Sequence, residues 1–211
     1  MTIVVDYDLG NVGSLLNMLK KAGVQARLSR DPGMIRDASR LFLPGVGAFD
    51  SGMANLDRLG LRGALDEAVL QRRVPVLGIC LGFQLLTKSS EEGTLPGLGW
   101  LDAETIALRN ISGNPGLRVP HMGWSRVQTT DASLFGGLEK DGRFYFVHTY
   151  GVREETCRDR ILATTEYGCR FVSSASRDNI AGTQFHPEKS HRFGLTLLQN
   201  FIANFPCPPS P

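Results

Sequence analysis

The sequence predicts an α/β fold with a mostly parallel central sheet, helices on both faces, and antiparallel strands added in the C-terminal half. In the first half, short apolar runs alternate with segments of helical periodicity. In the second half, short strand-like segments follow one another with few helices between them. The chain has 211 residues, which is the length of one large domain. Strand–helix–strand alternation requires parallel strands that helices cover on both sides.

The predicted elements of the first half run in alternating order. The β-branched run at residues 2–6 opens the sheet. A stripe of apolar residues over 12–19 predicts a helix that Gly23 can end. Asp31 and Pro32 indicate the N-cap and first residue of a short helix. The other expected strands are residues 24–28, 41–43 and 74–80, and the other expected helices are residues 61–69 and 81–88.

The second half is dominated by short strand candidates that Gly, Asn and Asp separate. These candidates are residues 104–108, 124–129, 143–148, 161–165, 170–174 and 180–185. Residues 193–205 predict a closing helix, and residues 206–211 form a Pro-rich tail. The sequence has no internal repeat and no linker, so we expect one domain over residues 1–205.

The charge balance argues against two classes of partner. Lys and Arg number 23 and Asp and Glu number 21, so the formal net charge is +2. We therefore expect neither nucleic acid nor a membrane surface as a partner. The chain also contains no long apolar run typical of a membrane span, and no signal peptide is visible at the N-terminus.

The four cysteines are Cys80, Cys157, Cys169 and Cys207, and no two of them form a C-x-x-C pair. This spacing predicts neither a structural zinc site nor a disulfide framework. The simplest setting for such a chain is the reducing cytoplasm. There, one cysteine can be reactive while the others have only a structural role.

Residues 78–82, Gly-Ile-Cys-Leu-Gly, form the sharpest local motif. A strand leads into it and a helix leads out, as in a nucleophile elbow with Cys80 as the nucleophile. Glycines stand two residues before and two residues after Cys80, because so tight a turn leaves no room for Cβ atoms there. The helix N-terminus favours a thiolate, and the Leu81 amide can point at a developing oxyanion. A buried structural cysteine is the alternative interpretation.

His186, Pro187 and Glu188 follow the last predicted strand. Residues i and i+2 of an extended segment point the same way, and Pro187 holds His186 in the extended region. Glu188 can then orient the His186 imidazole, and an oriented imidazole is the base that a cysteine nucleophile requires. The alternative for this pattern alone is a turn with a solvated glutamate.

Residues 44–47, Pro-Gly-Val-Gly, follow the strand at 41–43. Glycines there free the backbone to turn an N–H group towards the reacting carbonyl, which would supply a second oxyanion donor. A plain strand-end turn is the alternative. His186 and His191 lack the spacing of a familiar zinc motif, so we expect no metal, and the sequence indicates no cofactor.

These parts occur in the order oxyanion loop, Cys, His, Glu, and further motifs accompany them. They are Asp6-Tyr7-x-x-Gly10-Asn11, residues 119–124 (Val-Pro-His-Met-Gly-Trp), residues 144–148 (Phe-Tyr-Phe-Val-His) and residues 184–190 (Gln-Phe-His-Pro-Glu-Lys-Ser). The whole set resembles the class I, triad-type glutamine amidotransferases. Within that family it resembles the glutaminase subunits of imidazole glycerol phosphate synthase, over residues 2–205.

The resemblance implies a flavodoxin-like fold and hydrolysis of L-glutamine to glutamate and ammonia. In the family pattern, Cys80 attacks the side-chain amide and forms a glutamyl thioester, His186 transfers protons, and Glu188 orients His186. The oxyanion and glutamine-binding positions would be Gly45, Val46, Gly47, Leu81, Gly82, Gln84, Thr149 and Tyr150.

The resemblance also implies a protein partner. Free ammonia is mostly protonated at neutral pH, so a lone glutaminase would waste its substrate. In this family the partner of the heterodimer is a (β/α)₈-barrel cyclase subunit. That subunit uses the ammonia to make imidazole glycerol phosphate and an aminoimidazole carboxamide ribotide in histidine biosynthesis. The positions that match its interface or gate are Asn11, Met122, Trp124, Tyr145 and Lys189, with ordinary packing as the alternative.

Two positions depart from the family pattern. Ser125 stands where the family usually has Asn, and Asp8 replaces a typical small residue. Residues 15–23 and 87–93 resemble a paralogous branch that supplies ammonia for surface-polysaccharide sugars. The same glutaminase with a different acceptor is therefore the first alternative. A catalytically silent regulatory subunit of the same fold and a stand-alone cysteine hydrolase are the others, and the intact Cys-His-Glu set argues against the silent subunit.

Overall fold

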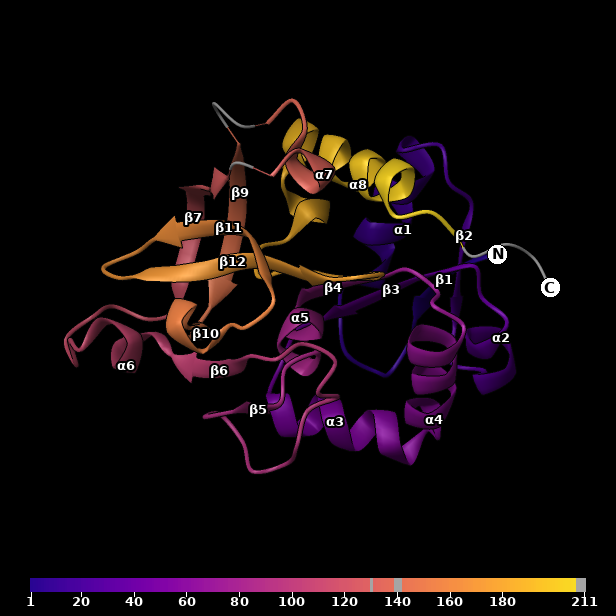
Figure 1. Ribbon diagram of the computed structural model, residues 1–211, viewed down its shortest axis with the longest axis horizontal. Helices are drawn as coiled ribbons and strands as arrows, with labels where there is room; N and C mark the ends of the chain where they lie inside the picture. Colours follow the sequence, from indigo (N-terminus) through magenta and orange to yellow (C-terminus); the bar gives the residue numbers. More distant parts are fainter. Residues whose placement is uncertain (130, 139–141, 208–211) are drawn as a thin grey trace.

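Strands and helices alternate along the first half of the chain in the computed structural model, which describes residues 1–129, 131–138 and 142–207 (Figure 1). The strands are β1 (Thr2–Val5), β2 (Ala26–Ser29), β3 (Arg40–Gly45), β4 (Val76–Cys80) and β5 (Ser89–Ser90). The helices are α1 (Val12–Lys21), α2 (Pro32–Arg36), α3 (Phe49–Arg58), α4 (Leu61–Asp66) with its π-helical continuation η1 (Glu67–Gln71), and α5 (Leu81–Leu85).

The second half is rich in strands and ends in a long helix. Its strands are β6 (Glu104–Ala107), β7 (His121–Arg126), β8 (Gln128–Thr129), β9 (Arg143–His148), β10 (Tyr150–Val152), β11 (Arg160–Glu166), β12 (Arg170–Arg177) and β13 (Ile180–Thr183). Its helical segments are α6 (Leu108–Ser112), α7 (Ala132–Phe135), η2 (Glu154–Thr156), η3 (Pro187–Lys189) and α8 (His191–Asn204).

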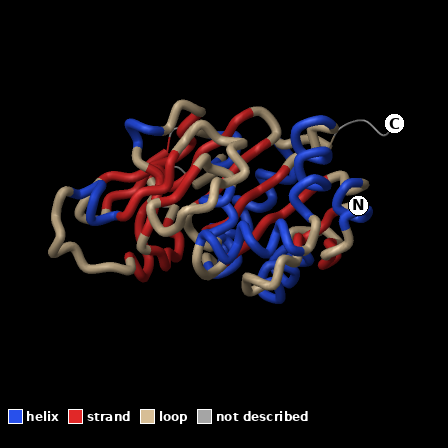
Figure 2. The backbone as a smooth tube through the Cα atoms, turned by 90° about the horizontal axis from the view of Figure 1, so that it is seen from below, coloured by secondary structure: helices blue, strands red, loops and turns tan. Residues whose placement is uncertain are grey.

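The parallel part of the large sheet has the order β2-β1-β3-β4-β13. This is the flavodoxin-like order, in which the carboxyl ends of the strands open onto a crevice. The order then continues antiparallel through β12, β10 and β6, as the sequence predicted. Strands β7 and β9 form a separate two-stranded sheet. Figure 2 shows the helices around the parallel strands on one side of the molecule and the remaining strands on the other.

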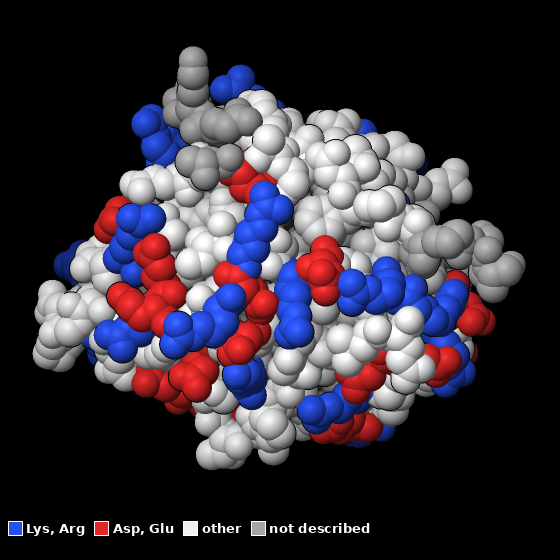
Figure 3. Space-filling model, viewed as in Figure 1, with Lys and Arg blue, Asp and Glu red and all other residues white. Residues whose placement is uncertain are grey.

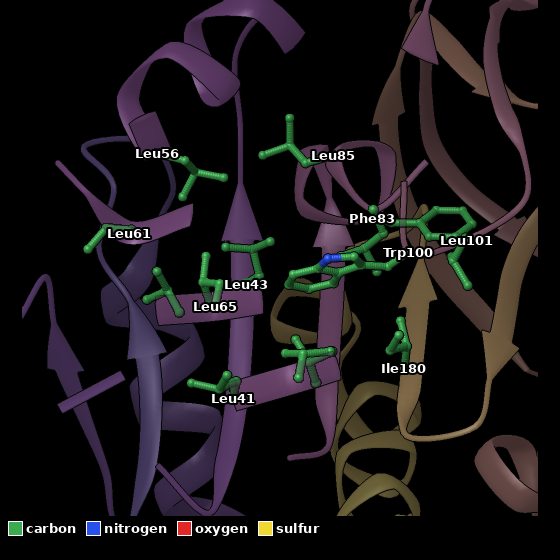
Figure 4. Close-up of a cluster of buried hydrophobic side chains, with 14 of the residues drawn as sticks. Leu41, Leu43, Leu56, Leu61, Leu65, Phe83, Leu85, Trp100, Leu101 and Ile180 are labelled. Atoms are coloured by element: carbon green, nitrogen blue, oxygen red, sulfur yellow. The ribbon is translucent and has the colours of Figure 1, made fainter. Parts of the chain in front are cut away.

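Alternate residues of the parallel strands supply two hydrophobic cores, one on each face of the sheet. Leu41 and Leu43 of β3 pack with Leu56 of α3 and Leu61 of α4 (Figure 4). Phe42, between the two leucines, belongs to the opposite core with residues of α1 and α8. Both faces of the sheet are therefore covered, which explains why its strands read as continuous apolar runs.

The structure differs from the sequence predictions at several element boundaries. Strand β3 does not end before Pro44 but runs to Gly45, because pairing with β4 continues there after pairing with β1 has ended at Phe42. The predicted strand 124–129 is divided into β7 and β8, which pair with different partners. The predicted helix 81–88 ends at Leu85, and α3 and β10 were not predicted.

Two further predictions concern the ends and the surface of the chain. Residues 206 and 207 of the predicted tail have no regular structure, while 208–211 lie outside the described residues, and the domain boundary after residue 205 stays a prediction. Both signs of charge are interspersed over the face in Figure 3, in keeping with the small net charge. Within the described ranges, no helix is long and apolar enough to cross a membrane.

Candidate active site

Cys80 occupies a strained turn between β4 and α5. Its φ is 54° and its ψ is −108°, a combination that costs a residue with a side chain about 1–3 kcal/mol. The residue is 6% exposed and lies at the carboxyl end of a parallel strand. The strand–turn–helix geometry that the motif predicted is therefore present, with the cysteine at its apex.

Three glycines give this turn the space that it needs. A Cβ atom at Gly82 would overlap the carbonyl oxygen of Leu43, and a Cβ atom at Gly78 would lie 2.8 Å from the carbonyl oxygen of Gly82. Gly45, which is paired with Cys80 across β3 and β4, is equally constrained, because a Cβ atom there would overlap the Tyr7 hydroxyl. Gly45 and Gly82 therefore shape the backbone around the cysteine.

His186 is held by hydrogen bonds on both its side chain and its backbone. Its Nδ1 atom lies 2.8 Å from Glu188 Oε1, and the two side chains are 1% and 5% exposed. Its N–H group donates to the Tyr145 carbonyl at 2.9 Å, and its carbonyl accepts from the Ser190 hydroxyl at 2.6 Å. The imidazole therefore has one fixed orientation, as the His-Pro-Glu pattern predicted.

The charges around His186 favour its protonated form. Burial disfavours the imidazolium, but Cys80 and Glu188 outweigh burial and raise the pKa of His186 to about 9. Its Nε2 atom and the Oε2 atom of Glu188 have no hydrogen-bond partner among the described residues. The arrangement can therefore hold an imidazolium whose Nδ1 faces Glu188 and whose Nε2 is free to exchange a proton.

A cavity of about 270 Å³ opens beside Cys80. The residues that line it are Val46, Gly47, Cys80, Leu81, Gln84, Glu92, Pro120, Val147, His148, Thr149 and Tyr150. Every predicted oxyanion or glutamine-binding residue except Gly45 and Gly82 is in this lining. A larger hollow of about 720 Å³, which includes Arg73, Arg158 and Arg160, contains none of the predicted site residues.

Comparison with known proteins identifies the family. The model of the family "Glutamine amidotransferase class-I" matches residues 3–205. The chain belongs to the class I glutamine amidotransferases. It is 50% identical over 205 residues to "Imidazole glycerol phosphate synthase subunit HisH 2" of Methanococcus maripaludis, covering 96% of this chain and 98% of that protein. It is 45% identical over 203 residues to the protein of the same name from Pseudomonas aeruginosa, covering 96% and 98%.

Solved structures agree on the fold of this amidotransferase. The structure of PurLQS from Thermotoga maritima has a TM-score of 0.73 and 17% sequence identity, and the match covers 96% of this chain and 97% of that one. A structure described as "Crystal structure of glutamine amidotransferase" has a TM-score of 0.69 and 19% sequence identity, and the match covers 95% of this chain and 99% of that one.

Glu92 is a cavity residue of this amidotransferase that the sequence reasoning missed. Its Oε2 atom accepts a hydrogen bond from the Phe49 N–H at the start of α3, at 2.9 Å. It lies in the loop after β5, far from any catalytic motif in the sequence. No local pattern indicated it, because the loop reaches the cavity only through the tertiary fold.

The other predicted cavity residues use their polar groups in different ways. Gln84 donates from Nε2 to the Tyr150 carbonyl at 2.9 Å, so its amide is already engaged within the protein. The Thr149 carbonyl accepts from the Leu108 N–H at 3.0 Å. Gly47 has a φ of 124°, a conformation that glycine adopts readily and that turns the chain beside the cavity.

Four of the five predicted interface residues gather on and beside the sheet of β7 and β9. Met122 and Trp124 are 61% and 46% exposed. The Trp124 ring lies 6.3 Å from the Tyr145 ring, and Lys189 Nζ lies 5.7 Å from the centroid of the Tyr145 ring. Asn11 is exposed immediately before α1. An exposed aromatic and apolar cluster of this kind is typical of a protein interface.

The remaining cysteines of this amidotransferase differ from Cys80 in their surroundings. Burial raises the pKa of the Cys157 thiol to about 11 and also raises the pKa of Cys169, which disfavours their thiolates. Cys207 is exposed in the segment after α8. Among the described residues, no group of three or more His, Cys, Asp or Glu side chains could hold a metal ion.

Proposed function

We propose that this chain is the glutaminase subunit of an amidotransferase, which hydrolyses L-glutamine to glutamate and ammonia and passes the ammonia to a synthase partner. The observation that carries the proposal is the strained Cys80 together with the buried His186–Glu188 pair, whose imidazole pKa Cys80 helps to raise, at the edge of a cavity that also contains a carboxylate. Nucleophile, oriented base and polar cavity are the three parts that acyl transfer from an amide requires.

The chemistry follows from the roles of these groups. The Cys80 sulphur attacks the side-chain amide carbon of glutamine, and the Leu81 N–H and the 44–47 loop stabilise the negative oxygen that forms. The imidazolium of His186 then gives its proton to the leaving nitrogen, which departs as ammonia and leaves a glutamyl thioester. His186 next takes a proton from water, whose oxygen attacks the thioester carbon. The Cys80 thiolate leaves and glutamate is released after its new carboxyl group loses a proton to solvent, which restores the starting pair of thiolate and imidazolium, while Glu188 keeps the imidazole oriented throughout.

Glu92 would recognise the α-ammonium group of the substrate. Glutamine carries one positive charge near one end, and among the residues that the structure describes Glu92 is the only carboxylate in the lining of the cavity beside Cys80. The backbone of Thr149 and Tyr150 lines the same cavity and supplies further polar groups. The assignment gives the cavity a preference for a free amino acid over an uncharged amide.

The partner we propose is a (β/α)₈-barrel cyclase subunit, in a heterodimer located in the cytoplasm. The relatives from Methanococcus maripaludis and Pseudomonas aeruginosa are named as subunits of imidazole glycerol phosphate synthase, which supports a complex whose product belongs to histidine biosynthesis. The interface would include Met122, Trp124 and Tyr145, since these side chains form an exposed aromatic and apolar cluster. The resemblance adds Asn11 and Lys189.

The decisive experiment separates glutamine use from ammonia use. The Cys80→Ser variant in complex with the cyclase is expected to lose glutamine-driven product formation, by at least about 10³-fold, and to keep the ammonia-driven reaction. The wild-type complex is the control. If glutamine-driven synthesis persisted in the variant, Cys80 would not be the nucleophile. If the isolated wild-type subunit hydrolysed glutamine as fast as the complex, the coupling to a partner would be wrong.

A second candidate keeps the chemistry and changes the acceptor. Ser125 and Asp8 depart from the usual family pattern in segments assigned to the interface. Residues 15–23 and 87–93 resemble the branch that serves surface-polysaccharide sugars. Co-purification distinguishes the two candidates, because a histidine-pathway cyclase supports the first and a synthase acting on a surface-sugar precursor supports the second.

A further inference from the structure

A continuous line of hydrogen bonds runs from Cys80 to strand β7. Next to the nucleophile, the Nε2 atom of Gln184 lies 3.8 Å from the Cys80 sulphur. The Oε1 atom of Gln184 accepts from Gln84 Nε2 at 3.1 Å, and Gln84 Nε2 also donates to the Tyr150 carbonyl at 2.9 Å. Gln184 is fully buried and Gln84 is 5% exposed, so neither amide can exchange these partners for bulk water.

The line continues on the far side of the Tyr150 carbonyl. His148 Nδ1 lies 2.7 Å from that oxygen, and His148 Nε2 lies 3.0 Å from His121 Nδ1. His121 Nε2 lies 2.8 Å from the Ser125 hydroxyl. Ser125, the position that departs from the family pattern, is therefore the outer end of the line.

The chemistry of the groups permits one direction of donation from Tyr150 towards Cys80. The Tyr150 carbonyl can only accept, so Gln84 must present its NH₂ group there. The second hydrogen of that group goes to Gln184, which must therefore present its oxygen to Gln84. Gln184 is then left with its NH₂ group facing the Cys80 sulphur. The orientation of the amide at the nucleophile is thus set by a carbonyl two residues along the line.

The same logic fixes both imidazoles. His148 must donate from Nδ1 to the Tyr150 carbonyl, and as a neutral ring it accepts at Nε2. His121 then donates from Nδ1 and accepts at Nε2 from the Ser125 hydroxyl. Both rings are neutral because burial lowers the pKa of His148 to about 3 and that of His121 to about 4. Each ring therefore has one tautomer.

We propose that Gln184 donates a hydrogen bond to the Cys80 thiolate and that the Tyr150 carbonyl fixes the direction of this donor. The inference rests on the proposed glutaminase function, since it concerns the same nucleophile. An N–H donor lowers the energy of a thiolate more than that of a thiol, because hydrogen bonds to a charged group are the stronger ones. Gln184 thus increases the fraction of Cys80 that is ready to attack.

Gln84 is a positioning residue that acts through Gln184. His148 keeps its proton on Nδ1 with or without the His121 donor, because the Tyr150 carbonyl beside it can only accept. Gln84 presents its NH₂ group to that carbonyl in either case, so the two amides keep their orientation when His121 is replaced. A substitution at Gln184 is therefore expected to reach Cys80, and one at His121 is not.

The test measures the pH dependence of Cys80 alkylation by iodoacetamide, followed by mass spectrometry of the Cys80 peptide so that the other cysteines do not interfere. Gln184→Met keeps the length of the side chain and removes the donor. It is expected to move the midpoint of the profile upwards by about one pH unit. His121→Phe keeps the ring stacking on Phe146 and Tyr167 and is expected to leave the midpoint unchanged, because the Tyr150 carbonyl still fixes the two amides.

Ser173→Ala is the matched control. Ser173 is buried, accepts the Gln184 backbone N–H at its carbonyl, and has a hydroxyl without a partner among the described residues. Its removal is expected to leave the midpoint unchanged. A Gln184→Met profile that coincides with the wild-type profile, or a His121→Phe or Ser173→Ala profile that shifts as far as that of Gln184→Met, would overturn the proposal.

A second measurement needs no substitution. In the wild-type chain, ¹⁵N NMR of labelled histidine is expected to show His148 and His121 each protonated at Nδ1 alone, and the opposite tautomer at His148 would overturn the line. Neither measurement uses glutamine. If only the proposed glutaminase function is wrong, the chain will not hydrolyse glutamine, but the alkylation profile of Cys80 will still shift in Gln184→Met. If only this inference is wrong, glutamine hydrolysis will be intact and the alkylation profile will not shift.

Discussion

The Nδ1 atom of His186 lies 2.8 Å from Oε1 of Glu188, and both side chains are almost fully buried. A buried carboxylate at this distance holds the imidazole in one tautomer and stabilises its protonated form. Glu188→Gln keeps the shape of the side chain and removes its charge. We expect glutamine hydrolysis by the complex to fall about 100-fold or more, mainly in kcat. Steady-state kinetics check this, and an unchanged kcat would contradict the role of Glu188.

The raised pKa of His186 makes folding stability depend on pH. The pKa is about 9 in the folded chain and ordinarily about 6.5 in an unfolded one. The protonated imidazole therefore contributes its full stabilisation below about pH 6.5, and this stabilisation is lost as the pH rises towards 9. Urea unfolding should show that the free energy of unfolding falls more between pH 6.5 and pH 9 in the wild-type chain than in Glu188→Gln. Equal losses would show that Glu188 does not support the imidazolium.

The turn at Cys80 predicts which glycines tolerate a methyl group. In Gly82→Ala the new Cβ would overlap the Leu43 carbonyl oxygen, so we expect a loss of about 3 kcal/mol in the free energy of unfolding. Gly63→Ala in α4 is the control, because no heavy atom lies within 4 Å of the added Cβ. It should raise stability by about 0.5–1 kcal/mol. Urea unfolding of both variants measures these changes. If Gly82→Ala lost less unfolding free energy than Gly63→Ala, this explanation of the turn would be wrong.

The carboxylate of Glu92 predicts a split between substrate binding and turnover. Glu92→Gln retains an oxygen that can accept the Phe49 N–H and removes the charge. We expect KM for glutamine to rise about tenfold or more, with a much smaller change in kcat. Glu91→Gln is the control, since Glu91 binds the Ala107 N–H and the Asn110 amide and is not part of the cavity lining. A similar KM in both variants would leave Glu92 without a role in binding.

The exposed cluster around Trp124 predicts where the partner binds. Trp124→Ala should raise Kd for the cyclase at least about tenfold, because buried aromatic side chains dominate interface energies. Leu70→Ala is the control, since Leu70 is 47% exposed, close to the 46% of Trp124, but lies on η1. Isothermal titration calorimetry of each variant with the cyclase measures the difference. Equal affinities would remove the sheet of β7 and β9 from the interface.

Much of the fold could be predicted because periodicity and turn residues carry local information. The range of β9 was predicted to the residue, and Asp31 caps α2 as expected by accepting from the Met34 N–H. Helix α3 was missed because Asp50, Gly52 and other polar or small residues interrupt its apolar positions. The three-residue strand β10 is too short to show alternation and exists only through its pairing with β6 and β12.

The site was predictable where chemistry depends on neighbours in sequence. The geometry around Cys80 and the contact of His186 with Glu188 each lie within a few residues and follow from glycine and proline conformations. Glu92 and the line from Gln184 to Ser125 could not be predicted in this way. Their contacts join segments that are distant in sequence, and only the sheet order decides that these side chains meet.

The position of β13 beside β4 also has a consequence for synthesis of the chain. Gln184 and Cys80 are 104 positions apart in the sequence, yet their side chains touch, because β13 joins the parallel strands last. A ribosome-bound chain that has emerged only as far as β12 contains Cys80 and Glu92 but still lacks His186. Under the proposed mechanism such a nascent chain cannot release ammonia, and hydrolysis would begin only when the C-terminal segment has been made and has docked.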